Sequence, residues 1–340
     1  MYNKLLHTPE GFRDIYGDEF LKRQVVKNTL LNTVKNYNYM NIDMPAIEYF
    51  DIFSSKIGTI PSNELYKFFD KEGNTLVLRP DFTPSIARVA ATYFADYNDT
   101  LRFMYSGSTF VNSSDLQGKL KESLEVGCEM IGDGTVEADY EIISMILDCA
   151  KALKIDDFQI SIGNVEFFKG LCKEYVFDKK TESDLRDMIS NKNYFGAKGI
   201  LDDTDISDDI KESILSISEL YGSYDCLDKA LELANNERSK TAIIRLQKLY
   251  DLVKESGREK YISFDLGMLS KYNYYTGVVF RGYTYGSGDA IFKGGRYDSL
   301  LNEFGKNSPA VGFAATVDQL VTVINRNGSD FFENIGKSQL

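Results

Sequence analysis

Residues 78–83 read Leu78-Arg79-Pro80-Asp81-Phe82-Thr83, and they stand where an extended pattern gives way to a helical one. Before them, strands at 65–70 and 75–79 and their connecting turn predict a β-hairpin. After them we predict a helix to Tyr97, with Asp81 or Thr83 as its N-cap. A hairpin that runs straight into a helix is typical of α+β proteins.

The rest of the chain extends this pattern. Residues 166–261 are helical and rich in charge, which indicates an insertion into a core formed by residues 1–165 and 262–325. Residues 326–340 read as a polar tail. We expect a mainly antiparallel sheet flanked by helices, because regular βαβ alternation is lacking. Further strands are predicted at 41–48, 101–111, 122–132, 158–163, 263–267, 274–285, 289–293 and 310–316, and further helices at 17–39, 135–153 and 318–324.

Composition excludes several classes of protein. The 340 residues carry a net charge of −12, which disfavours broad contact with nucleic acid, including tRNA. His7 is the single histidine, so metal sites and catalytic pairs that need histidine are weakly supported, and we expect neither a metal nor a cofactor. We find no apolar run long enough for a membrane span and no secretory signal, and therefore expect a cytoplasmic protein. We expect reduced, mostly buried thiols at Cys128, Cys149, Cys172 and Cys226.

Three stretches are candidates for chemistry: residues 78–83, 125–132, and 273–277 together with 294–298. Each also has a purely structural interpretation, as a helix cap, a solvated strand face, aromatic packing and a glycine turn. The functional hypothesis joins them in one site, where carboxylates bind an ammonium group and tyrosines supply stacking area and hydroxyls. An amino acid fits that chemistry.

Taken together, these motifs resemble histidyl-tRNA synthetase, a class II aminoacyl-tRNA synthetase. The resemblance covers residues 8–165 and 262–324 and implies the class II catalytic fold. The matching stretches are Pro9 to Ile15, Tyr39 to Glu48, the hairpin at 65–70, Leu78 to Thr83, Glu129 to Gly132, Tyr274 to Gly277, Gly294 to Asp298, and Pro309 to Ala314.

The resemblance implies a histidine-binding pocket. Asp81 and Thr83 would face the ligand's ammonium group, and Glu129 with the two tyrosines would hold its imidazole end. One position departs from the synthetases, since Glu125 stands where they have glutamine. The implied pocket residues are Asp81, Thr83, Glu125, Glu129, Tyr274 and Tyr275.

Four further departures concern the synthetase reaction. The resemblance places Val111 where an arginine contacts the α-phosphate of ATP and Ser113 where a glutamate follows; another arginine is replaced by Gln319. Ser270 replaces the arginine that would contact the ligand carboxylate, although Lys271 is adjacent. Because arginines stabilise the charge that develops during phosphoryl displacement, their loss makes adenylation implausible. We also expect no anticodon-binding domain after residue 325.

A paralogue of the synthetase catalytic domain fits these departures. The stretch Leu78 to Thr83, with aspartate rather than glutamate at Asp81, is similar to the regulatory subunits of ATP phosphoribosyltransferase. That resemblance implies histidine as effector, a short-form catalytic ATP phosphoribosyltransferase as partner, and feedback control of the first step of histidine biosynthesis. It also implies a homodimer within a hetero-oligomer. Two alternatives stay open: an active histidyl-tRNA synthetase catalytic domain, and a stand-alone amino-acid-binding protein.

Overall fold

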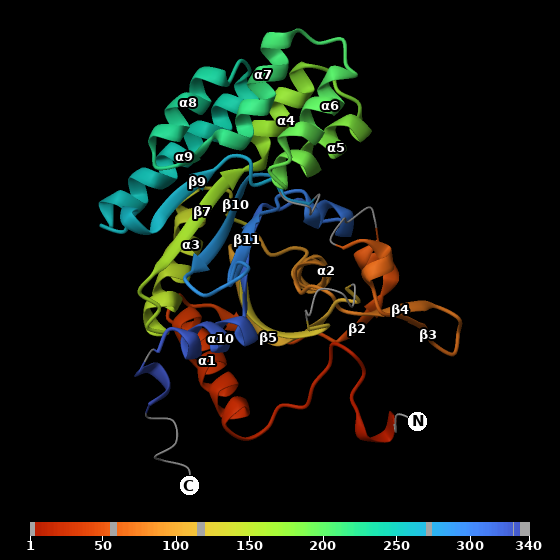
Figure 1. The fold of residues 1–340 in the computed structure, drawn as a ribbon. Helices are drawn as coiled ribbons and strands as arrows, with labels where there is room; N and C mark the ends of the chain where they lie inside the picture. Colours follow the sequence, from red (N-terminus) through yellow and green to blue (C-terminus); the bar gives the residue numbers. More distant parts are fainter. Residues whose placement is uncertain (1–3, 55–59, 114–119, 270–273, 329, 334–340) are drawn as a thin grey trace.

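A nine-stranded sheet forms the centre of the protein, in the order β1-β5-β6-β12-β11-β10-β7-β9-β8 (Figure 1). The computed structural model describes residues 4–54, 60–113, 120–269, 274–328 and 330–333. Only the β1–β5 and β7–β9 pairs in this sheet run parallel, so the predicted mainly antiparallel α+β fold is confirmed. The strands are β1 (Met40–Asn41), β5 (Leu101–Phe110), β6 (Glu122–Ile131), β7 (Phe158–Asn164), β8 (Tyr221–Gly222), β9 (Ile262–Asp265), β10 (Val278–Thr284), β11 (Phe292–Arg296) and β12 (Ala310–Thr316).

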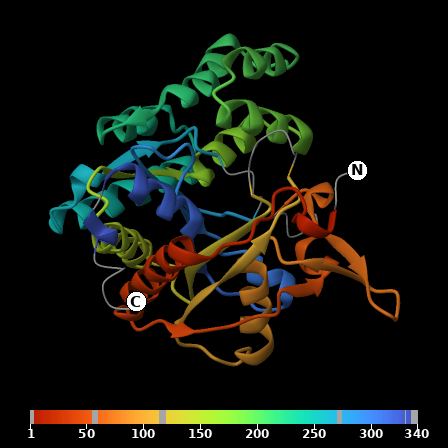
Figure 2. The same ribbon diagram turned by 60° about the horizontal axis from the view of Figure 1, so that its bottom comes forward.

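One face of this sheet is covered by α1 (Gly17–Lys35), α3 (Val136–Ala152), α9 (Glu237–Glu255) and α10 (Val317–Arg326). Figure 2 shows α1 beside α10 on this face. Because successive strand residues point to opposite faces, the buried side chains of Met104, Cys128 and Phe313 lie abreast and pack under these helices.

The opposite face is partly covered by α2 (Thr83–Tyr93) and the short 3₁₀ helix η7 (Leu300–Phe304). Ile86 and Ala90 of α2 pack there against Phe103 and other buried apolar side chains. The helix begins at Thr83, close to the predicted position, but the predicted N-cap was wrong: the N-cap is Phe82, which makes no side-chain capping hydrogen bond. The Asp81 carboxylate lies just before it and accepts a hydrogen bond from the Thr83 amide at 3.1 Å. The helix ends at Tyr93 rather than Tyr97.

A second, three-stranded sheet has the order β2-β4-β3. Its strands β3 (Lys67–Phe69) and β4 (Thr75–Leu78) are the predicted hairpin, which projects on the right of Figure 1. The single strand predicted at 41–48 was wrong, because it divides into β1 and β2 (Ile47–Tyr49), which join different sheets. Pro45 lies between the two strands, where it cannot donate to a ladder.

Three other predicted elements differ in extent. The strand predicted at 289–293 is β11 at Phe292–Arg296, so Gly294 and Gly295 lie in a strand rather than in a turn. The helix predicted at 17–39 ends at Lys35, and Asn38 just beyond it takes a left-handed conformation with φ of 63°. The strand predicted at 274–285 begins only at Val278. Residues 274–277 therefore belong to a loop that leads into β10, which leaves both tyrosines outside the ladder.

The helical segment, defined here as α4 to α9, lies at the top of Figure 1 above β9. Its short strand β8 pairs with β9 at the sheet edge. The division of the chain into a core and an insertion at 166–261 stays a prediction. The other helices of the segment are α4 (Val165–Glu174), α5 (Lys179–Ser190), α6 (Tyr194–Asp202), α7 (Asp208–Ser216) and α8 (Asp225–Leu233).

The four cysteines are buried and free of disulfides, as predicted. Among the described residues, every helix is too short or too polar to cross a membrane.

Candidate ligand site

Glycines open the face of the sheet that carries the site. Glu129 on β6 lies opposite Gly312 on β12, which in turn lies opposite Gly295 on β11. A Cβ on Gly312 would overlap the Glu129 carboxyl oxygen, and one on Gly295 would come within 2.8 Å of the Tyr275 ring. The absent side chains therefore let Glu129 and Tyr275 lie flat on the neighbouring strands.

Glu129 is held by two hydroxyl groups. Thr83 donates to its Oε1 at 2.8 Å, and Tyr297 donates to its Oε2 at 2.5 Å. The residue is only 2% exposed, and burial raises the pKa of its carboxyl to about 8, even though both hydrogen bonds favour the charged form. Burial dominates because water is excluded from both sides of the strand at this point. The structural alternative of a solvated strand face is therefore wrong for Glu129.

Asp81 and Tyr274 form the second contact in the site. The Tyr274 hydroxyl donates to Asp81 Oδ2 at 3.3 Å, while Asp81 Oδ1 accepts the Thr83 amide. Burial raises the pKa of the Asp81 carboxyl above its ordinary range. The Tyr274 ring also packs on Tyr275, with centroids 4.7 Å apart, and meets Tyr297 edge-on at 5.9 Å. The two predicted tyrosines are thus both packing residues and a wall of the site.

Glu125 completes the set. It lies on β6 opposite Gly107 and is half-buried. Burial, followed by the charge of Asp81, raises the pKa of its carboxyl to about 8, while the charges of Lys293 and Arg79 lower it. The six predicted pocket residues are therefore brought together: Asp81, Thr83, Glu125, Glu129, Tyr274 and Tyr275.

Three residues of the site were missed by the sequence analysis. Tyr297 donates a hydrogen bond to Glu129. It belongs to the motif at 294–298, so the sequence could have identified it as a candidate. The hydroxyl of Tyr105 lies over Gly127. Arg79 stacks on Phe82 at 4.1 Å and donates to main-chain carbonyl oxygens, which fixes it beside the site.

The four residues that replace synthetase residues in this chain lie in different parts of the sequence. Val111 follows β5, where its amide donates to the Lys121 carbonyl at 2.9 Å, and Ser113 stands two residues further on. Gln319 lies in the first turn of α10, and its buried Oε1 has no hydrogen-bond partner among the described residues. Ser270 and Lys271 lie outside the described residues.

The arrangement suits a small cationic ligand. Three carboxyl groups with raised pKa values lie between tyrosine rings and hydroxyls, and an ammonium or imidazolium group would offset their desolvation. Within the described part of the chain, no three His, Cys, Asp or Glu side chains gather as a metal site requires. The geometry thus supports binding of an amino acid better than binding of a metal.

Fold and site together define a class II synthetase core of the histidyl type, and residues 11–320 match the histidyl-tRNA synthetase family. A relative from Acetivibrio thermocellus named ATP phosphoribosyltransferase regulatory subunit is 39% identical over 96% of this chain and 78% of its own. A relative of the same name from Clostridium acetobutylicum is 36% identical over 96% and 80%. The chain belongs to this family of ATP phosphoribosyltransferase regulatory subunits.

A solved structure supports the same assignment. The crystal structure from Bacillus halodurans, described as an ATP phosphoribosyltransferase regulatory subunit/histidyl-tRNA synthetase, superposes with a TM-score of 0.86 at 32% identity, over 93% of this chain and 83% of that one. The histidyl-tRNA synthetase structure from Nostoc, at 22% identity and a TM-score of 0.79 over 95% and 76%, shows the shared fold.

Proposed function

We propose that this chain is the non-catalytic regulatory subunit of an ATP phosphoribosyltransferase and that it binds L-histidine at the site described above. One observation supports the proposal: within the same fold, the groups that suit an amino acid are present, whereas the arginines that would bind ATP are replaced. The carboxyl and tyrosine groups that suit an amino acid are assembled, while Val111 and Gln319 occupy positions where the resemblance calls for arginines.

Phosphate chemistry gives the physical reason. Activation of an amino acid by ATP develops negative charge on the transferring phosphate, and each missing cation removes several kcal/mol of transition-state stabilisation. Neither valine nor glutamine supplies a positive charge. The chain therefore contributes assembly and feedback control by histidine, and the short-form catalytic subunit performs the chemistry.

The outer face of the small sheet supports a homodimer within the complex. Ile47 and Tyr49 on β2 are 46% and 56% exposed, whereas Val77 on the opposite face is fully buried. Exposed apolar side chains on a sheet face mark an interaction surface. Sedimentation velocity on the isolated chain measures this association, and a purely monomeric chain at high concentration would contradict it.

Ligand choice is the first experiment. Isothermal titration should detect L-histidine, and ATP should bind weakly or undetectably, since the carboxyl site is complete and the phosphate arginines are absent. Histidine-dependent exchange of pyrophosphate into ATP should stay at background. Clear exchange would instead identify an active synthetase domain, and binding of ATP without histidine would contradict the proposed site.

Reconstitution tests the partner. The catalytic subunit should be nearly inactive alone, active with this chain, and inhibited by histidine in the complex. Because histidine shifts the complex only by its differential affinity for two states, we expect an effect of roughly 5–150-fold. Combined substitution of Asp81 and Tyr275 should keep activation and remove inhibition. Undiminished inhibition in that variant would place the histidine site elsewhere.

A further inference from the structure

Arg281 is exceptional among the arginines. The chain has twelve, and within the described residues eleven of them bind a carboxylate, a hydroxyl or a main-chain carbonyl. Arg281 has no such partner in the described part of the chain, although it is half-buried on β10. In a protein with a net charge of −12, an unpaired guanidinium on a strand face is available for an external anion.

The neighbours of Arg281 suit the same kind of ligand. Strand register places Lys293 on β11 and Ser161 on β7 directly beside it, and Ser263 on β9 follows next to Ser161. Adjacent strands lie about 4.8 Å apart, so these four side chains form a row about 14 Å long on one face. Neither serine hydroxyl has a hydrogen-bond partner among the described residues. The row therefore offers two cations followed by two free hydroxyls.

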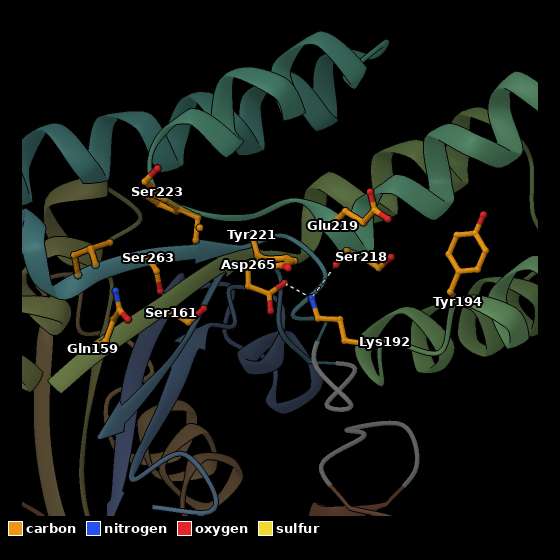
Figure 3. A pocket seen from close by; sticks show the side chains of 13 residues that line it. Gln159, Ser161, Lys192, Tyr194, Ser218, Glu219, Tyr221, Ser223, Ser263 and Asp265 are labelled. Atoms are coloured by element: carbon orange, nitrogen blue, oxygen red, sulfur yellow. Dashed lines mark hydrogen bonds and ion pairs between the residues drawn. The ribbon is translucent and has the colours of Figure 1, made fainter. Parts of the chain in front are cut away.

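A cavity of about 860 Å³ adjoins the serine end of this row. The sheet side contributes Gln159, Ser161 and Ser263, and the helical segment contributes Ser218 and Lys192 (Figure 3). Lys192 spans the two sides, because its ammonium donates to Asp265 Oδ1 at 2.8 Å and to the Ser218 carbonyl at 3.2 Å (Figure 3). The volume lies within the ordinary range for small-molecule sites.

We propose that this row and cavity form a second ligand site, which takes a small phosphate ester of a polyhydroxy compound. Arg281 binds the phosphate as a bidentate donor, and Lys293 adds charge beside it. Ser161, Ser263 and Gln159 exchange hydrogen bonds with the ligand's hydroxyl groups, since each can both donate and accept. The acidic groups next to the two lysines do not compete for Arg281, because Asp289 is paired with Lys293 and Asp265 with Lys192.

The site is separate from the proposed histidine site. Tyr275 lies over Gly295, and Arg281 stands in the next row along the sheet, two residues beyond Val279 on the same strand. Both sites lie on the same face of the sheet, and Lys293 is near enough to Glu125 to lower the pKa of its carboxyl, so the two sites adjoin at Lys293. The proposal does not depend on a catalytic partner or on histidine.

The test titrates the full chain with inorganic phosphate, glycerol 3-phosphate and ribose 5-phosphate, with glycerol and ribose as controls. The phosphorylated compounds should bind and the free polyols should not. Arg281→Met should weaken their binding by roughly tenfold or more, and Arg281→Lys by less, because lysine keeps the charge without the bidentate geometry. Ser263→Ala should weaken ribose 5-phosphate while leaving inorganic phosphate unchanged.

Lys254→Met is the matched control. It removes one positive charge from an exposed position on α9, across the sheet from the proposed site, and should leave phosphate binding intact. An equal loss in both variants would mean nonspecific electrostatics and would overturn the proposal. Absence of phosphate binding in the unmodified chain would overturn it too. Should Arg281→Met weaken histidine and not phosphate, Arg281 serves the amino-acid carboxylate and no second site exists.

Discussion

Glu129 shows how a single residue can be tuned by its surroundings. Its carboxyl is buried between Thr83 and Tyr297, and its pKa of about 8 means that it is largely protonated near neutral pH in the empty site. A cationic ligand favours the ionised form and would release that proton on binding. Histidine affinity should accordingly rise with pH as the pKa of Glu129 is approached.

The same shift affects stability. Folding raises the pKa of this carboxyl from 4.5 to about 8, so the folded chain holds the proton more tightly than the unfolded chain does. Above pH 4.5 the unfolded chain gains stability by ionising at Glu129, whereas the folded chain does not ionise there until the pH approaches 8. The free energy of unfolding therefore falls as pH rises from 4.5 to 8. At pH 7 the penalty is on the order of 3 kcal/mol, from about 1.4 kcal/mol for each pKa unit between 4.5 and 7.

Glu129→Gln should remove this penalty. Thermal melting should show the variant more stable than the unmodified chain at pH 8, with a gap that closes toward pH 5, while histidine binding is lost. Glu137→Gln, at an exposed position in the first turn of α3, is the control and should follow the unmodified chain at every pH. A gap independent of pH would mean that Glu129 keeps an ordinary pKa.

Gly312 is a second residue whose small size decides the site. Gly312→Ala should lower the melting temperature and weaken histidine binding, because its Cβ would collide with the Glu129 carboxyl and the Cys128 carbonyl. Main-chain atoms on the paired strand cannot move aside cheaply. Gly199→Ala, in helix α6 with open space around it, should instead stabilise by up to about 1 kcal/mol. Unchanged histidine binding in Gly312→Ala would show that Glu129 can shift without consequence.

At the scale of elements, α4 is tied to the tyrosine loop. Lys169 on α4 donates to the main-chain carbonyl of Tyr275 at 2.8 Å and pairs with Glu166 at 3.5 Å. Glu166 in turn accepts from Arg238 on α9 at 2.6 Å. Burial lowers the pKa of the Lys169 ammonium. This chain of contacts links the helical segment to the backbone that carries one wall of the site.

Lys169→Met should therefore weaken histidine binding several-fold without unfolding the protein, because it frees the carbonyl that anchors Tyr275. Titration with histidine measures the affinity, and a melting curve measures the stability of the variant. Lys173→Met, exposed one turn further along α4, is the control and should bind histidine normally. Equal affinities in the two variants would show that the loop holds its position without Lys169.

At the scale of the whole molecule, one buried carboxylate joins three elements. Asp139 on α3 is fully buried and pairs with Arg296 on β11 at 2.7 Å and with Arg245 on α9 at 2.6 Å. Arg296 also binds Asp298 at 3.0 Å. These ion pairs connect α9 of the helical segment, α3 of the helix layer and β11 of the sheet at one point. The motif at 294–298 is thus structural as well as part of the site.

Asp139→Asn should destabilise the protein by about 3–5 kcal/mol, because among the described residues it leaves Arg245 without a carboxylate partner and the buried Arg296 with Asp298 alone. Chemical denaturation measures the loss. Asp202→Asn removes a charge from an exposed pair with Lys198 inside α6 and should leave the free energy of unfolding nearly unchanged. A loss of similar size in both variants would mean that the buried network contributes no more than a surface pair.

Much of this protein could be predicted from local sequence. The hairpin at β3 and β4, the start of α2 near Thr83 and the strands β5 and β6 follow from local sequence patterns, because turn chemistry and side-chain period act locally. The resemblance named the six residues of the proposed pocket, and the fold brings them together because motif order preserves which strands and loops meet.

Tertiary structure decided what local patterns could not. Strand register placed Gly312 under Glu129, and only that placement buries the carboxyl and raises its pKa. Residues far apart in the chain decide the division of the 41–48 stretch between two sheets and the contact of Lys169 with Tyr275. They also decide that Arg281 has no partner in the part of the chain that the structure describes. The physical reason is common to all of them: burial and pairing of a side chain are set by which distant strand or helix packs against it, and the residue's own neighbours in sequence carry no record of that partner.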